Sequence, residues 1–219
     1  MRKAILTALL VTTAHTLVHA TPSGLDNIPT ADTVGDRTVA IQGYDTFGSG
    51  GANNYAMGFK AGLDFLPLKL ELGLDSGLAP SPAGPLYFQG KAAVSPWQDG
   101  QFAIGVANVG LTNQNRAGDP FSYGVLTQDF KFARLSLGYG LQTDNNSVLI
   151  GLDRTWKIFG DHDFMLCSDL VQTNDQSGWL TSVGFKYEIC KSVIFETWAN
   201  LPDRGQTSFV AKLNYVFHF

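Results

Sequence analysis

The stretch Leu213-Asn214-Tyr215-Val216-Phe217-His218-Phe219 closes the sequence and decides the fold that we expect. Leu213, Tyr215, Phe217 and Phe219 occupy every second position. An apolar period of two is typical of a β-strand with one apolar face. The terminal residues of soluble domains are usually polar and poorly ordered. An aromatic strand at this place therefore indicates a strand whose apolar face meets an apolar environment.

This ending resembles the C-terminal signature of bacterial outer-membrane β-barrels, whose last strand alternates aromatic or aliphatic residues and ends on Phe. The resemblance implies an outer-membrane location with the lipid bilayer as partner. It also implies that Leu213, Tyr215, Phe217 and Phe219 form a membrane-insertion signal read by the barrel-assembly machinery. Residues 21–33 are similar to the leader of uncharacterised bacterial barrel proteins, a family that supplies no mechanism.

The N-terminal residues predict export. Arg2 and Lys3 precede the mostly apolar stretch Ala4–Val18, and Val18-His19-Ala20 fits a small-x-Ala cleavage site. A membrane anchor is the alternative, but a spanning helix needs about 20 apolar residues. We therefore expect a cleaved signal peptide over residues 1–20, an extended periplasmic leader over 21–36 and one outer-membrane barrel over 37–219.

The composition agrees with a membrane barrel. Charged residues make up 16% of the 219 residues, aromatic residues 12%, and there are 24 glycines. Soluble domains typically contain about 25% charged residues. Without Arg2 and Lys3, the 15 basic side chains fall to 13 against 19 acidic ones, which argues against nucleic acid as a partner. No long apolar run predicts a transmembrane helix after the signal.

Alternation divides the chain into strands. The pattern predicts an all-β, transmembrane, antiparallel up-and-down β-barrel of about 12 strands, within a range of 10–14. Short periplasmic turns are expected at 67, 127–131 and 190–191, and longer outer loops at 76–85, 110–120, 172–178 and 201–206. The expected strands lie near residues 38–47, 55–65, 68–75, 86–94, 102–109, 121–125, 133–140, 148–153, 164–171, 181–188, 193–200 and 209–219.

In the clearest strands all ionisable residues fall on the same alternate positions and therefore on one face of the strand. The other face is then free of charge, as a surface in contact with lipid requires. A soluble barrel alternates too, with its apolar face inside, so parity alone leaves the direction open; the terminal aromatic strand and the Gly-rich polar faces favour a polar lumen. The candidate lumen-lining residues are Lys60, Asp64, Lys69, Glu71, Asp75, Arg134, Asp153, Lys186, Glu188, Glu196 and Lys212.

Three functions remain open on this evidence. The leading one is a narrow, non-enzymatic pore for small solutes or ions, because rings of charge set the preferences of such channels. The first alternative is a closed structural or surface-binding barrel that acts through its outer loops, because interleaved charges of both signs also pair and seal a lumen. The second alternative is a soluble secreted β-protein.

Motifs for catalysis, metals and cofactors are missing. Only His162 and His218 follow the signal peptide, and neither belongs to a metal-binding spacing such as H-E-x-x-H. A solvated turn explains Asp161-His162-Asp163 at least as well as a metal site. The outer-membrane phospholipases, the omptin proteases and the lipid A acyl-modifying barrels each need a histidine that this chain does not place suitably. We therefore predict no enzyme, no catalytic residue, no metal and no cofactor.

Two further features carry predictions. Cys167 and Cys190 fall out of register on neighbouring strands, which disfavours a disulfide without excluding one. Trp97 and Trp156 lie near expected periplasmic strand ends and Trp179 near an outer end. Such positions suit aromatic girdles at the two membrane interfaces, with ordinary core tryptophans as the alternative.

Overall fold

The structure, a computed structural model, describes residues 23–48, 54–78, 84–143, 145–173 and 178–219. The expected signal peptide lies outside these residues, as do parts of two expected outer loops. The strands are β1 (Thr38–Gly48), β2 (Asn54–Phe65), β3 (Leu68–Gly77), β4 (Leu86–Trp97), β5 (Gly100–Gly110), β6 (Phe121–Asp129), β7 (Arg134–Leu141), β8 (Asn146–Ile158), β9 (His162–Thr173), β10 (Gly178–Cys190), β11 (Val193–Pro202) and β12 (Ser208–His218), with one short helix, α1 (Gln114–Ala117).

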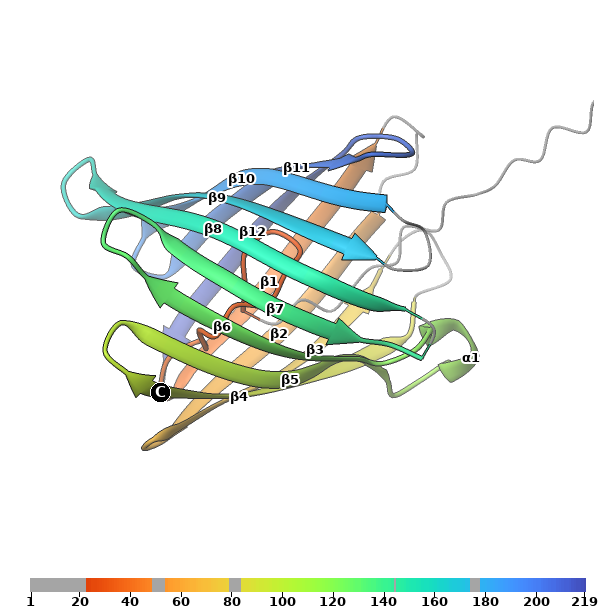
Figure 1. Cartoon of the computed structure of the whole chain (residues 1–219), viewed down its shortest axis with the longest axis horizontal. Helices are drawn as coiled ribbons and strands as arrows, with labels where there is room; N and C mark the ends of the chain where they lie inside the picture. Colours follow the sequence, from red (N-terminus) through yellow and green to blue (C-terminus); the bar gives the residue numbers. More distant parts are fainter. Residues whose placement is uncertain (1–22, 49–53, 79–83, 144, 174–177) are drawn as a thin grey trace, which may run out of the picture.

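The strands form one closed antiparallel barrel in which each strand pairs with its neighbours in sequence (Figure 1). β1 and β12 close the ring along their whole length, from Thr38 opposite His218 to Gly48 opposite Ser208. Closure leaves no sheet edge with unpaired backbone groups, which the interior of a bilayer does not tolerate. The predicted up-and-down barrel of 12 strands is confirmed.

The two ends of the barrel differ, and we name them by their connections. The turn end carries the links 66–67, 98–99, 130–133, 159–161 and 191–192, together with the chain terminus. The loop end carries the other links, among them residues 111–120 with α1. Several strands run further toward the loop end than the alternation predicted; β3, for example, ends at Gly77. Among the described residues, no helix is long and apolar enough to cross a membrane.

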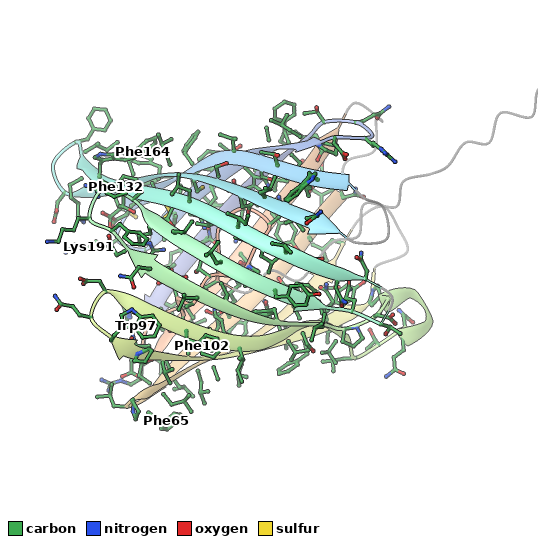
Figure 2. The ribbon with its side chains drawn as sticks, in the orientation of Figure 1. Phe65, Trp97, Phe102, Phe132, Phe164 and Lys191 are labelled. Carbon is green, nitrogen blue, oxygen red and sulfur yellow. The ribbon has the colours of Figure 1, made fainter. Side chains whose placement is uncertain are left out.

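Large apolar side chains cover the outside of the barrel (Figure 2). On β2, Tyr55, Met57 and Phe59 are 46%, 50% and 41% exposed, whereas Ala56 and Lys60 between and beside them are buried. A soluble barrel would bury the apolar parity and expose the charged one. The molecule has the opposite arrangement, which argues against the soluble secreted β-protein considered above.

Aromatic side chains gather on the outside at the turn end, where Figure 2 labels Phe65, Trp97 and Phe132. Trp97 ends β4 and Trp156 lies near the end of β8, both exposed. Trp179 is the second residue of β10 at the loop end and is exposed as well. All three tryptophans thus lie on the outer surface near strand ends, where we predicted girdles. The role in a membrane interface stays a prediction.

Candidate functional site

The inner face of the barrel is polar and tightly buried. Six of the predicted lumen-lining residues are at most 8% exposed, and they come from five different strands of the barrel. Buried charges in proteins are normally paired, because an unpaired charge in a low-dielectric interior is costly. The six are Lys60, Glu71, Asp75, Asp153, Glu196 and Lys212.

The other five predicted residues are less buried. The side chains of Arg134 and Lys186 are 27% and 18% exposed and join the same interior ion pairs. Asp64 and Lys69 face each other across β2 and β3 next to the turn end. Glu188 lies near the end of β10, where its carboxylate accepts the backbone N–H of Asp163 at 3.0 Å. These last three therefore lie at the rim rather than in the middle of the lumen.

One cluster forms around Glu196 on β11. Its carboxylate lies 3.3 Å from Lys186 Nζ and 3.6 Å from Lys212 Nζ, and it accepts a hydrogen bond of 2.7 Å from Asn214 Nδ2. One carboxylate thus neutralises two lysines from the strands on either side. The interleaving of charge seen in the sequence becomes direct pairing across strands.

A second cluster forms around Asp75 on β3. Gln42 Nε2 donates to one carboxylate oxygen at 2.8 Å, and Gln89 Nε2 donates to the other at 2.6 Å. Gly58 makes room for this arrangement, because a Cβ at that position would lie 2.0 Å from Asp75 Oδ1 and 2.3 Å from Gln42 Nε2. The arc β1–β4 is therefore filled by its own side chains.

Residues 23–34 lie inside the barrel and form a short hairpin, which we call the luminal hairpin (Figure 1, the red and orange segment before β1). Gly24 pairs with Pro29, and Leu25 N–H donates to Ile28 O at 3.0 Å. Leu25 and Ile28 are 6% and 2% exposed. We had expected an extended periplasmic leader here. The structure differs because two apolar side chains and the backbone groups of this segment find partners on the inner wall.

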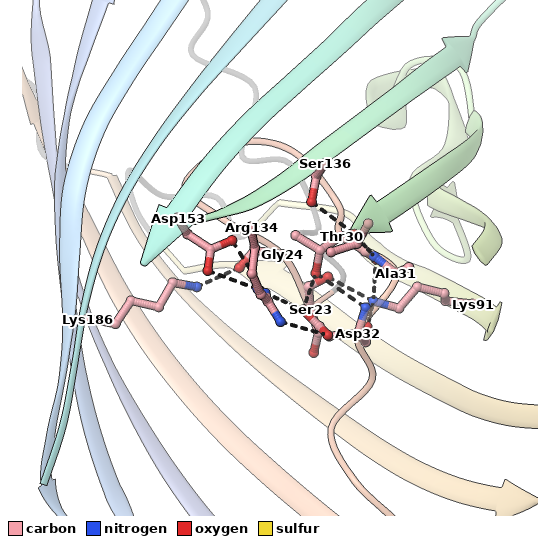
Figure 3. Close-up of polar contacts among 11 residues, drawn as sticks. Ser23, Gly24, Thr30, Ala31, Asp32, Lys91, Arg134, Ser136, Asp153 and Lys186 are labelled. Carbon is pink, nitrogen blue, oxygen red and sulfur yellow. Dashed lines mark hydrogen bonds and ion pairs between the residues drawn. The ribbon is translucent and has the colours of Figure 1, made fainter. Parts of the chain in front are cut away.

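On one wall the luminal hairpin is held by Glu71 of β3 and Lys91 of β4. The Glu71 carboxylate accepts the N–H groups of Ser23 at 2.7 Å and Val34 at 2.9 Å. Lys91 Nζ donates to Ser23 O at 2.8 Å, to Thr30 O at 3.2 Å and to Asp32 O. Glu71 and Lys91 also lie 3.7 Å apart. One ion pair thus fixes both strands of the hairpin, and Figure 3 shows the bonds that Lys91 makes to it.

On the facing wall two cations reach the hairpin (Figure 3). Arg134 of β7 bridges Asp32 of the hairpin at 2.7 Å and Asp153 of β8 at 3.0 Å. Lys186 of β10 donates to Gly24 O at 2.5 Å. Three basic side chains from different walls are therefore satisfied by oxygens of the hairpin.

The tip of the hairpin is bound by β9, β10 and β11. Asp169 Oδ2 accepts the N–H groups of Asn27 at 2.6 Å and Ile28 at 3.2 Å. The Asn27 side chain donates to Ser182 Oγ and, at 2.8 Å, to Asn200 Oδ1. Counting Glu71 on β3, hydrogen bonds reach the hairpin from both sides of the β1–β12 seam.

Apolar contacts complete the docking. Leu25 and Ile28 pack with Leu149 of β8 and Cys167 of β9. Ala31 packs on the β4–β6 wall, in a cluster with Ala93, Ala103, Tyr123 and Val125. These contacts explain why β6 turns its apolar parity, Tyr123 and Val125, inward and not toward the outside.

Sequence reasoning missed several interior residues. Lys91 shares the parity of Tyr87 and Gln89 on β4, so the same alternation rule would have found it. Asp169 likewise shares the buried parity of Cys167 on β9. Asp32 gave no such signal, because it lies in the hairpin and not in a strand.

The cysteines and the histidines make individual contacts; His218 Nδ1, for example, lies 2.8 Å from Thr38 Oγ1. Cys167 is buried and Cys190 exposed, and both are free. Cys167 Sγ donates to Asp26 Oδ1 at 3.2 Å. His162 packs against Tyr187, with ring centroids 6.2 Å apart. Within the described ranges, no three His, Cys, Asp or Glu residues are grouped so that they could hold a metal ion.

Comparison with solved structures finds the same architecture in outer-membrane porins. A KdgM porin aligns with a TM-score of 0.59 and 11% identity over 82% of this chain and 99% of the porin. A KdgM porin in complex with disordered oligogalacturonate gives 0.59 and 12% over the same shares. NanC porin gives 0.53 and 10% over 81% of this chain and 98% of its own.

No protein-family model matches the chain, and no curated protein matches it either. The chain has a porin-like barrel fold, and at these identities the likeness concerns the fold alone.

Proposed function

We propose that the protein is a porin-like channel of the bacterial outer membrane that passes small polar solutes or ions without enzymatic chemistry. One observation carries the proposal: a closed barrel of 12 strands has an apolar outer surface and an inner face lined by charges of both signs. Eight-stranded barrels are filled by their side chains, whereas wider ones leave space for water and solutes.

The proposal includes an orientation and a route of assembly. Short turns face the periplasm in outer-membrane barrels, so the turn end is the periplasmic end and the loop end faces outward. β12 carries the exposed residues Leu213, Tyr215 and Phe217 on its outer face, and the exposed Phe219 follows directly after the strand. We assign these four to recognition by the barrel-assembly machinery after export through the periplasm.

Conductance across a planar lipid bilayer tests the channel. The protein is purified from membranes in detergent, and its heat-modifiable gel mobility confirms folding. It is compared with a variant that lacks residues 23–34, whose lumen no longer holds the hairpin. Discrete current steps from either folded form support a channel, and their reversal potential in a salt gradient gives the sign of its selectivity. Silence from both folded forms contradicts the proposal.

The closed barrel remains the second candidate, because the luminal hairpin and the Asp75 and Glu196 clusters occupy the interior. In that case the outer loops carry the function. Neutralising Lys212 by Lys212→Gln would then leave function intact, whereas shortening the loop at residues 111–119 would abolish it. The bilayer measurement above separates the two candidates, because only the channel passes current.

A further inference from the structure

We propose that the luminal hairpin is an autoinhibitory plug: while it is docked it closes the route through the barrel, and its displacement opens the route. The inference rests on the proposed channel function. It goes beyond that function because it assigns the closed and open states to two positions of one segment of the chain.

The position of the hairpin supports closure. Its polar partners lie on opposite walls of the barrel, for example Lys91 on β4 and Asp169 on β9. Thr127 of β6 adds a bond of 3.0 Å to Ala31 N–H. Beside the hairpin, the Asp75 and Glu196 clusters fill the arc from β11 through β12 to β4. A solute that crosses the barrel therefore has to move the hairpin or the strands themselves.

The chemistry of the contacts between the luminal hairpin and the wall is compatible with displacement of the hairpin. The polar contacts between hairpin and wall described above involve side chains of the strands, not their backbone groups. The ladder between neighbouring strands is therefore independent of the hairpin and survives its departure. The charges of Glu71, Lys91 and Arg134 that bond to the docked hairpin would be rehydrated as it leaves and water enters, and water replaces such hydrogen bonds at small net cost.

The docking is also imperfect. Asp26 and Asp169 are 3% and 2% exposed, and each keeps one carboxylate oxygen, Asp26 Oδ2 and Asp169 Oδ1, without a hydrogen-bond partner in the described part of the chain. A buried acceptor without a donor is destabilising. Hydration on release removes this penalty, so the docked and displaced states are closer in free energy than the number of contacts suggests.

A reversible lock tests the plug directly. Cys167 Sγ already contacts the Asp26 side chain at 3.2 Å, so Asp26→Cys places a second thiol beside it. The lock variant carries Asp26→Cys together with Cys190→Ser, and loss of both free thiols on oxidation confirms the crosslink. We expect its oxidised form to carry at least about tenfold less mean current than its reduced form. The Cys190→Ser protein alone serves as control, with current that does not respond to oxidation.

Weakening the dock gives the complementary test and does not depend on the crosslink. Asp32→Asn removes the ion pair with Arg134, and Asp119→Asn makes the same chemical change in an exposed loop. We expect the first substitution, and more strongly the deletion of residues 23–34, to raise the mean current several-fold while the second leaves it unchanged. All variants are checked for heat-modifiable folding.

The outcomes separate the plug from the channel. If the oxidised lock variant conducts like its reduced form, or the complete protein conducts like the deletion variant, the barrel conducts past a docked hairpin and the plug is wrong. If no folded form conducts, including the deletion variant, the proposed channel function is wrong, and the proposed plug is then wrong as well.

Discussion

Glu196 has a central place among the interior charges, because its carboxylate lies between two lysines. Its side chain pairs with both Lys186 and Lys212. Removing one partner of a buried ion pair typically costs about 3–5 kcal/mol, because the remaining charge stays buried. We expect Glu196→Gln to lower the free energy of unfolding by about 3 kcal/mol in urea titrations in lipid vesicles.

A rim position provides the control for this change. Glu188 is partly exposed near the turn end, and its contact to Asp163 N–H can be kept by a glutamine oxygen. We expect Glu188→Gln to cost less than about 1 kcal/mol. Equal losses from both substitutions would contradict the placement of Glu196 between two buried lysines.

Gly58 and Gly43 test packing on the inner and the outer face. A methyl group at Gly58 meets the Asp75–Gln42 hydrogen bond, whereas nothing lies within 4 Å of a Cβ at Gly43. Overpacking of a filled interior costs about 1–3 kcal/mol. We expect Gly58→Ala to lower the urea midpoint and Gly43→Ala to leave it unchanged or raise it. The reverse order would show that the inner and outer faces have been exchanged.

Among the elements, β12 shows how far the sequence determines the fold. Its alternation predicted a strand with Lys212 and Asn214 on the polar face, and both are buried inside. For β6 the alternation predicted the strand but not its direction. Tyr123 and Val125 turn inward because the hairpin residue Ala31 packs on them, and no local pattern in β6 records a partner about 90 residues away.

The outer face of β12 carries its own prediction. Leu213 lies at the middle of the strand and is 51% exposed. A lysine on the lipid-facing surface costs about 2–4 kcal/mol at the membrane midplane and about 0–1 kcal/mol near the interfaces. We expect Leu213→Lys to reduce stability in vesicles by the larger amount and Ile189→Lys, exposed near the turn end, by the smaller. A larger loss at Ile189 would place the membrane elsewhere on the barrel.

At the scale of the whole molecule, the sequence predicted a closed barrel and most of its interior charges but not what fills it. The leader was predicted as extended because it carries Pro22, Pro29 and several Asp and Thr residues. Its conformation depends on partners such as Glu71 and Lys91, which come together only when distant strands close into a ring. Such contacts are invisible to any rule that reads neighbouring residues.

The apolar contacts of the hairpin with the wall predict how much the whole barrel loses in stability when these contacts are weakened. Leu25 and Ile28 bury their side chains against β8 and β9. Burying one such side chain contributes about 1.5–3 kcal/mol. We expect the double variant Leu25→Ser, Ile28→Ser to unfold at lower urea concentration while it keeps its heat-modifiable gel shift. Loss of the gel shift would mean that the ring does not form without the hairpin.

The hairpin also bears on the order in which the molecule is built. Before β1 and β12 meet, the twelve strands form an open ribbon whose edges must find each other. Glu71 lies on the third strand from one edge and Asn200 on the second from the other, and both bind the hairpin. A segment that binds strands near both edges lowers the entropic cost of bringing β1 and β12 together, because fewer free residues then separate the two edges. We therefore expect the luminal hairpin, which contacts strands on both sides of the seam, to favour the closure of β1 on β12.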